Sequence, residues 1–226
     1  MLLRIMRLGE IDVQFTGHSG FLLDVAGMKV ALDPLGLGER VEKVDLLLLS
    51  HGHYDHCSIK DIEKLVRKGT MVVCPADCPS KLAKIEGIEM QVVEAGESCS
   101  FGELVIEVVP AYCVGKEFHT KSEGFVGYVL KYGNTILYHC GDSDVIPEMQ
   151  KLSGYGKDGN MFICLLPVSG TYCMTAEEAA SAAGVLHASV AIPMHYGAGV
   201  GTVGDAQRFK KLCGEKGIRA EVLEKI

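Results

Sequence analysis

The stretch that decides the fold is VDLLLLSHGHYDHCS, residues 44–58. Residues 44–49 are apolar apart from Asp45 and do not alternate with polar residues, as expected for a strand that is covered on both faces. Three histidines and an aspartate follow within six positions, so a tight loop at the end of this strand can aim four donors into one crevice: His51, His53, Asp55 and His56. Imidazole and carboxylate groups suit Zn²⁺, Fe or Mn²⁺. Because an open catalytic site usually keeps three protein ligands per metal, four in one loop indicate two metals.

The segments on either side of this loop predict strands first and strand-helix repeats later. Short runs rich in Val, Leu and Phe with glycine between them predict an antiparallel meander over residues 11–34. Ser58 is a plausible N-cap for a helix over residues 58–68, and Thr175 with Glu178 forms a capping box for another. Further strands are expected at residues 70–75, 127–132, 135–139, 161–168, 189–195 and 218–226, and further helices at 78–85, 144–152, 175–187 and 204–215. We predict one α/β domain over residues 1–226, with two sheets and outer helices.

Composition narrows the class of protein. The net charge is −7 and no block of Lys and Arg stands out, so the basic footprint of a nucleic-acid or anionic-lipid partner is missing. No apolar run approaches the roughly 20 residues that span a bilayer, and Arg4, Arg7 and Glu10 interrupt any signal-peptide core. The nine cysteines are scattered and odd in number, which favours buried free thiols over disulfides. We therefore expect a cytoplasmic protein without a membrane partner.

The H-x-H-x-D-H pattern at residues 51–56, directly after a buried strand, resembles the metallo-β-lactamase superfamily. Five other blocks resemble its branch of L-ascorbate-6-phosphate lactonase and related metal-dependent hydrolases: FTGHSGFLLDVAGMKVALDP (15–34), AYCVGKEFHTKSEGFVGYVL (111–130), LYHCGDSDVIPEM (137–149), LPVSGTYCMTAEEAA (166–180) and IPMHYG (192–197). The resemblance implies a four-layer αββα sandwich with two metals at one edge, between the sheets.

The same resemblance implies a set of metal ligands. His51, His53 and His119 would hold the first metal; Asp55, His56 and His195 would hold the second; and Asp142 would bridge both. Asp142 follows a predicted strand, where an Asx-turn or helix N-cap is the alternative role. His119 lies in a long loop, and His18 and His139 are its rivals for the first site.

A hydrolase with two divalent ions is the function that the resemblance implies, with Zn²⁺ expected first and Mn²⁺ or Fe as alternatives. A metal-bound hydroxide would attack a small ester, lactone or phosphoester, phosphorylated or not. Asp55 would orient the nucleophile, and His18, His139 or Tyr196 would assist the leaving oxygen. Asp33 is our candidate for fixing a metal-bound histidine. The expected partner is a small molecule, and association into a homo-oligomer stays open.

Other functions remain as alternatives at this point. The same ligands hold two irons in redox relatives of this fold, although no flavodoxin-like segment accompanies them here. A tRNA or other nucleic-acid phosphodiesterase is disfavoured by the acidic charge balance, and a metal-binding protein without activity by the complete ligand set. His187 is expected to interact only with a helix end. The glycine-rich residues 195–205 would form a rim, an anion-binding turn or simply turns.

Overall fold

In the computed structural model, which describes residues 5–226, the first sheet has seven strands in sequence order. Its strands are β1 (Met6–Leu8), β2 (Ile11–Gly17), β3 (Gly20–Val25), β4 (Met28–Leu32), β5 (Leu46–Leu48), β6 (Met71–Cys74) and β7 (Glu89–Val92). The pairs from β1 to β4 are antiparallel, whereas those from β4 to β7 are parallel. The predicted meander is therefore present and is extended by β1.

The second sheet has six strands in the order β13-β12-β11-β10-β9-β8. They are β8 (Ser98–Phe101), β9 (Leu104–Pro110), β10 (Val126–Tyr132), β11 (Thr135–His139), β12 (Met161–Pro167) and β13 (Val190–Met194). β10 and β11 form the predicted hairpin, with Gly133 at φ 52° in its turn. β11, β12 and β13 are parallel, so their carboxyl ends share one edge of the sheet.

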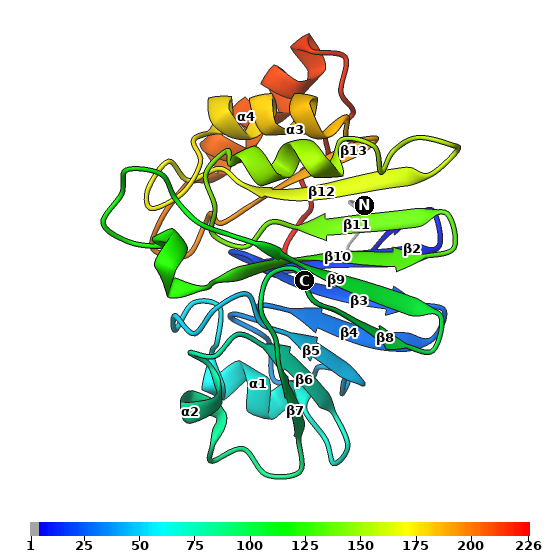
Figure 1. The fold of residues 1–226 in the computed structure, drawn as a ribbon, viewed down its shortest axis with the longest axis vertical. Helices are drawn as coiled ribbons and strands as arrows, with labels where there is room; N and C mark the ends of the chain where they lie inside the picture. Colours follow the sequence, from blue (N-terminus) through cyan, green and yellow to red (C-terminus); the bar gives the residue numbers. More distant parts are fainter. Residues whose placement is uncertain (1–4) are drawn as a thin grey trace.

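Helices cover the outer faces of the two sheets (Figure 1). α1 (Ile59–Leu65) and α2 (Pro79–Leu82) lie on the first sheet, and α3 (Ala176–Leu186) and α4 (Val203–Glu215) on the second. Short 3₁₀ helices, η1 (Lys121–Glu123) and η2 (Pro147–Leu152), complete the set. The predicted capping box starts α3, since the Thr175 hydroxyl accepts from the Glu178 N–H at 3.2 Å. These layers confirm the α/β, four-layer αββα sandwich.

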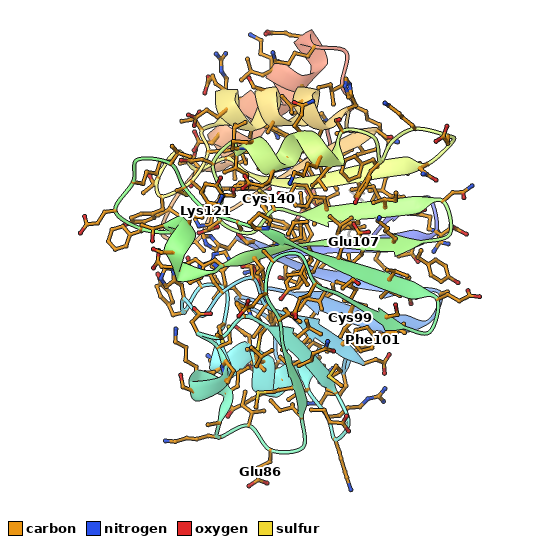
Figure 2. The ribbon with its side chains drawn as sticks, viewed as in Figure 1. Glu86, Cys99, Phe101, Glu107, Lys121 and Cys140 are labelled. Carbon is orange, nitrogen blue, oxygen red and sulfur yellow. The ribbon has the colours of Figure 1, made fainter. Side chains whose placement is uncertain are left out.

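The short strand β5 explains the unbroken apolar run before the histidine loop. Leu46 and Leu48 face the core between the two sheets. The side chains of this core, Cys140 among them, fill the space between the sheets (Figure 2). Leu47 and Leu49 face the second apolar cluster, beneath α1. Because successive side chains of a strand point to opposite faces, both faces of β5 must be apolar when both are buried. The strand is thus held rigidly where the loop begins.

The last predicted strand, residues 218–226, was wrong. This segment makes two isolated bridges, Ala220 with Ala191 of β13 and Lys225 with Phe15 of β2. It crosses from one sheet to the other and so cannot keep a ladder with either. The predicted helices at 144–152 and 78–85 shorten to the 3₁₀ helix η2 and the single turn α2. Within residues 5–226, no helix is long and apolar enough to cross a membrane.

Candidate metal centre

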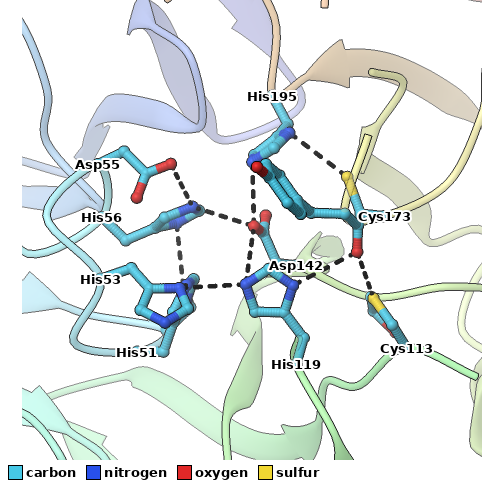
Figure 3. Close-up of polar contacts among 12 residues, drawn as sticks. His51, His53, Asp55, His56, Cys113, His119, Asp142, Cys173 and His195 are labelled. Carbon is cyan, nitrogen blue, oxygen red and sulfur yellow. Dashed lines mark hydrogen bonds and ion pairs between the residues drawn. The ribbon is translucent and has the colours of Figure 1, made fainter. Parts of the chain in front are cut away.

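The predicted ligands meet at one edge of the sandwich, where strands of both sheets end (Figure 3). Asp33 follows β4 and the histidine loop follows β5, while Asp142 and His195 follow β11 and β13. Parallel strands bring their carboxyl ends to one edge, where ligands of open α/β sheets usually bind. Topology therefore unites predicted metal ligands that lie up to 144 positions apart, from His51 to His195.

His51, His53 and His119 form the first group of donors. His53 Nδ1 lies 3.1 Å from His51 Nε2 and 3.1 Å from His119 Nε2. Each of these three nitrogens carries either a proton or a single lone pair. Two-centre hydrogen bonds alone therefore do not explain why His53 Nδ1 lies close to two other imidazole nitrogens. His119, and neither of its rivals His18 and His139, joins this group.

His18, Asp55, His56 and His195 form the second group. His18 Nε2 lies 3.0 Å from Asp55 Oδ2, and His56 Nε2 lies 3.8 Å from the same oxygen. His18 comes from the turn between β2 and β3, and its side chain is fully buried. The sequence left His18 as a rival for the first metal, but the fold brings it to the second group.

Asp142 lies between the two groups and is 2 % exposed. Its Oδ2 is 3.0 Å from His195 Nε2, 3.4 Å from His56 Nε2 and 3.6 Å from His119 Nε2. One carboxylate therefore contacts members of both groups. This is the position that the sequence resemblance implies for a bridging ligand.

Four of the histidines turn Nδ1 outward to a supporting acceptor. Ser50 Oγ donates to Asp33 and Ser169 Oγ donates to a backbone carbonyl, so each hydroxyl can accept an imidazole proton. The Nδ1 contacts are His51 to Ser50 Oγ (2.9 Å), His56 to Asp33 Oδ2 (2.7 Å), His119 to the Tyr172 carbonyl (3.4 Å) and His195 to Ser169 Oγ (2.9 Å). We assign the Nδ1–H tautomer from these partners, which leaves the Nε2 lone pairs facing inward. Metal-bound histidines typically show this arrangement.

Charge and burial favour a cation at this place. Burial lowers the pKa of His51 well below its usual value, and the charge on His56 lowers it further. Burial opposes ionisation of Asp142, but His195 and His56 hold its pKa well below the usual range. Burial likewise opposes ionisation of Asp55, and the His18 hydrogen bond nevertheless lowers the pKa of Asp55 to about 2. The site therefore combines ionised carboxylates with a neutral imidazole at His51. Burial opposes a charge on His56, but Asp142 and Asp33 hold the pKa of His56 well above its usual value, so a metal ion bound there would displace a proton from His56.

His139 and Tyr196 do not reach this cleft. His139 is fully buried, its Nε2 lies 2.9 Å from the Ser19 carbonyl, and its Nδ1 accepts the Gly141 N–H at 3.3 Å. Both ring nitrogens are thus occupied by backbone, which corrects our expectation that His139 could protonate the leaving group. The Tyr196 ring packs on Phe15 with centroids 5.4 Å apart and faces a neighbouring cavity. His187 is exposed at the C-cap of α3, as expected.

A cleft of about 420 Å³ opens over the centre. Ala198, Gly199 and Val200 lie along it, so the glycine-rich stretch forms part of the rim. Sequence reasoning missed the aromatic members of the lining, and it missed Cys173, whose Sγ lies 3.4 Å from His195 Nδ1. A tyrosine between two predicted ligands, in HYDH, and a phenylalanine before His119 were the available signals for the aromatic lining. The cleft is lined by His53, Tyr54, Asp55, Phe118, His119, Asp142, Tyr172, His195, Ala198, Gly199 and Val200.

Comparison with known proteins agrees with this geometry. Residues 12–195 match the model of the β-lactamase superfamily domain, so the chain belongs to that superfamily. A UPF0173 metal-dependent hydrolase of Pyrococcus furiosus is 31% identical over 222 residues, covering 91% of this chain and 93% of the relative. The chain therefore belongs to the UPF0173 family of metal-dependent hydrolases, which confirms the predicted enzyme class.

Solved structures share the fold over nearly the whole chain. A protein of Parabacteroides distasonis superposes with a TM-score of 0.81 at 26% identity, covering 95% of this chain and 94% of that one. Igni18, a metallo hydrolase of the archaeon Ignicoccus hospitalis, gives a TM-score of 0.75 at 22% identity, with 95% of each chain covered. Each superposition takes in 95% of this chain, so the two-sheet sandwich is shared over nearly its whole length.

Proposed function

We propose that this protein is a dinuclear metal-dependent hydrolase acting on a small ester, lactone or phosphoester. His51, His53 and His119 would hold one divalent ion, and Asp55, His56 and His195 the other, with Asp142 shared. The observation that carries the proposal is the set of four imidazoles whose Nδ1 atoms contact supporting acceptors and whose Nε2 atoms converge on Asp142 or His53.

The donors fit metal ions in spacing and in burial. Bonds of 2.0–2.1 Å in tetrahedral geometry place neighbouring ligand atoms about 3.3 Å apart. The contacts around His53 and Asp142 run from 3.0 Å to 3.6 Å. Within residues 5–226, His56 Nε2, Asp142 Oδ1 and His195 Nε2 are buried without a hydrogen-bond partner. Such atoms are costly unless a ligand satisfies them.

Bound ions would supply a nucleophile from water at neutral pH and polarise the bond under attack. Asp55 faces the cleft and would orient that water by accepting a hydrogen bond from it, and His18 holds the Asp55 carboxylate through the 3.0 Å contact. Of our three candidates for a proton donor to the leaving oxygen, only His18 contacts a cleft residue. Hydrolysis consumes one water: its oxygen bonds to the attacked centre, the bond to the leaving oxygen breaks, and a proton passes to that oxygen.

Several finer points of the proposal rest on sequence. Three imidazoles favour Zn²⁺ at the first site, while the carboxylates of the second also suit Mn²⁺ or Fe. The inclusion of lactones among the proposed substrates rests on the sequence blocks that resemble the L-ascorbate-6-phosphate lactonase branch. A cytoplasmic location and a small-molecule partner remain predictions, and self-association remains open. The relatives are named metal-dependent hydrolases, a name that does not favour a di-iron redox enzyme. The net charge of −7 disfavours a nucleic-acid phosphodiesterase.

The test is hydrolysis of an ester, lactone and phosphodiester panel by protein loaded with Zn²⁺, Mn²⁺ or Fe²⁺. His51→Ala and Asp55→Ala should each lower the metal content by at least one ion per chain and reduce turnover to background. His187→Ala, at an exposed helix end, is the matched control and should keep both. Full turnover by His51→Ala would contradict the proposal. Iron with visible absorption in protein purified without added metal would instead support the redox alternative.

A further inference from the structure

Three large aromatic side chains stand exposed around the cleft. The exposed fractions are 79% for Tyr54, 48% for Phe118 and 46% for Tyr172. Single exposed apolar side chains are common on proteins, whereas a group around one concavity marks a binding site. Tyr54 belongs to the histidine loop, Phe118 to the β9–β10 loop and Tyr172 to the β12–α3 loop, so three separate loops converge here.

Phe118 and Tyr172 form an ordered pair. Their rings lie edge to face with centroids 5.5 Å apart. Tyr172 has φ 69°, a left-handed conformation that is an outlier for a bulky residue. Two hydrogen bonds hold this backbone conformation. Cys113 Sγ donates to the Tyr172 carbonyl at 2.8 Å, and His119 Nδ1 donates to the same oxygen. Backbone strain maintained in this way clusters at ligand sites, and here it presents the Tyr172 ring beside a proposed metal ligand.

The cleft has no fixed cation of its own. Among residues 5–226, no Lys or Arg lines it, and its charged side chains are the carboxylates Asp55 and Asp142. Lys116 lies in the same loop as Phe118, but its ammonium is bound to the Asp144 carboxylate at 2.5 Å and to the Cys173 carbonyl at 2.8 Å. Metal ions would neutralise the reacting group only. A phosphate elsewhere on a substrate would therefore find no counter-charge in this cleft.

We propose that the substrate is an uncharged ester or lactone carrying an aromatic or other planar apolar group, which lies against Phe118 and Tyr172. This rests on the proposed hydrolase function and narrows its substrate class. The group packs against the exposed side of this ring pair while the acyl carbon reaches the Asp55 and Asp142 end of the cleft. Water adds to the acyl carbon, the acyl C–O bond breaks, and a proton from the water passes to the leaving oxygen. An ester gives a carboxylic acid and an alcohol or phenol, and a lactone gives one hydroxy acid that carries both groups.

The experiment compares four probes on metal-loaded protein: dihydrocoumarin (a neutral aryl lactone), δ-valerolactone (neutral, without an aromatic ring), 6-phosphoglucono-δ-lactone, and bis(p-nitrophenyl) phosphate. We expect kcat/KM for dihydrocoumarin to exceed that of each other probe at least tenfold. Phe118→Leu and Tyr172→Leu should raise KM for dihydrocoumarin about 2- to 12-fold, the range of an aromatic contact, and leave δ-valerolactone within twofold. Val114→Ala is the matched control, because Val114 is 61% exposed in the same loop but does not line the cleft.

The possible results separate the two proposals. Faster turnover of the phosphorylated lactone or of the phosphodiester, or an unchanged KM for dihydrocoumarin in both leucine variants, overturns the substrate class and leaves the hydrolase intact. Equal losses on dihydrocoumarin and δ-valerolactone also overturn it, because the rings would then act on the site as a whole. No turnover of any probe by protein with its full metal content counts against the hydrolase function itself.

Discussion

Asp33 supports the histidine loop from beneath, and its replacement by asparagine tests whether that support tunes metal binding. The carboxylate is 1 % exposed. Its Oδ1 accepts the Ser50 N–H at 2.7 Å, and its Oδ2 accepts from His56 Nδ1 at 2.7 Å and from Ser50 Oγ. Both oxygens thus face donors. Asparagine keeps the shape but removes the charge and turns an amide N–H₂ toward one set of these donors.

The expected effect is large on metal binding. A hydrogen bond to a charged group contributes about 1.5–3 kcal/mol, and loss of a carboxylate that orients a metal-bound histidine typically weakens metal binding about 10–100-fold. That range equals about 1.4–2.8 kcal/mol. We therefore expect Asp33→Asn to weaken binding of one ion, the one held by His56, by that factor. Binding of the ion held by His51 should weaken less, since Ser50 Oγ still accepts the Nδ1 proton of His51.

The assay is competition for Zn²⁺ with a chromophoric chelator, together with denaturant unfolding of the metal-free protein. Asp61→Asn is the matched control: this buried carboxylate also accepts backbone N–H groups, from Gly36 at 2.8 Å and Leu37 at 3.1 Å, but in the first turn of α1. Both variants should unfold more readily, and only Asp33→Asn should lose affinity. Equal Zn²⁺ affinity in the two variants would refute the reasoning.

Three further predictions concern His119, Gly141 and Glu148. His119→Ala should bind one ion fewer per chain by elemental analysis while remaining folded; two retained ions would contradict the first group. Gly141→Ala should lower the free energy of unfolding by about 1 kcal/mol or more and should lower the metal content. Gly141 has φ 62°, and a Cβ there would lie 2.8 Å from a backbone carbonyl, so the chain would shift and displace Asp142. An unchanged midpoint in denaturant unfolding would contradict this. The hydrogen bond from Lys121 is the main cause that lowers the pKa of Glu148 from 4.5 to about 2. Since that pKa is depressed on folding, its stabilisation is full above pH 4.5 and lost between pH 4.5 and 2; solvent exposure limits it to less than about 1 kcal/mol. Glu148→Gln should therefore unfold slightly more readily at pH 7 and equally at pH 2, and a gap that is constant with pH would contradict this.

The histidine loop and its strand were predictable because their causes are local. A strand buried on both faces reads as an apolar run, and β5 divides Leu46 and Leu48 from Leu47 and Leu49 in this way. Donors packed into the loop after such a strand must point to the same edge. The convergence of the loop's own donors was therefore predictable from their spacing, whereas their division between two metals came from the family resemblance.

The distant members of the site were harder to place, for a physical reason. His18, His119 and His195 all have φ between 57° and 59°, in the left-handed region. Non-glycine residues adopt this conformation when surrounding structure imposes it, so no local pattern announces it. The same holds for the group to which His18 belongs, since its contact with Asp55 depends on how the β2–β3 turn lies against the loop that follows β5 in the same sheet.

His139 is a residue that the sequence placed near the cleft but the structure places outside it. Its position three residues before Asp142 suggested a role in the cleft, but the side chains of neighbouring strand residues alternate between faces. His139 ends β11 and turns into the interior, where it pairs with the Ser19 carbonyl. Proximity in sequence to a predicted ligand did not predict proximity in space.

The most direct test of the two-metal centre is anomalous scattering from crystals grown with Zn²⁺ and recorded on both sides of its absorption edge. We predict two peaks per chain, one among His51, His53 and His119 and the other among Asp55, His56 and His195, with Asp142 between them. A single peak, or peaks away from these side chains, would contradict the account.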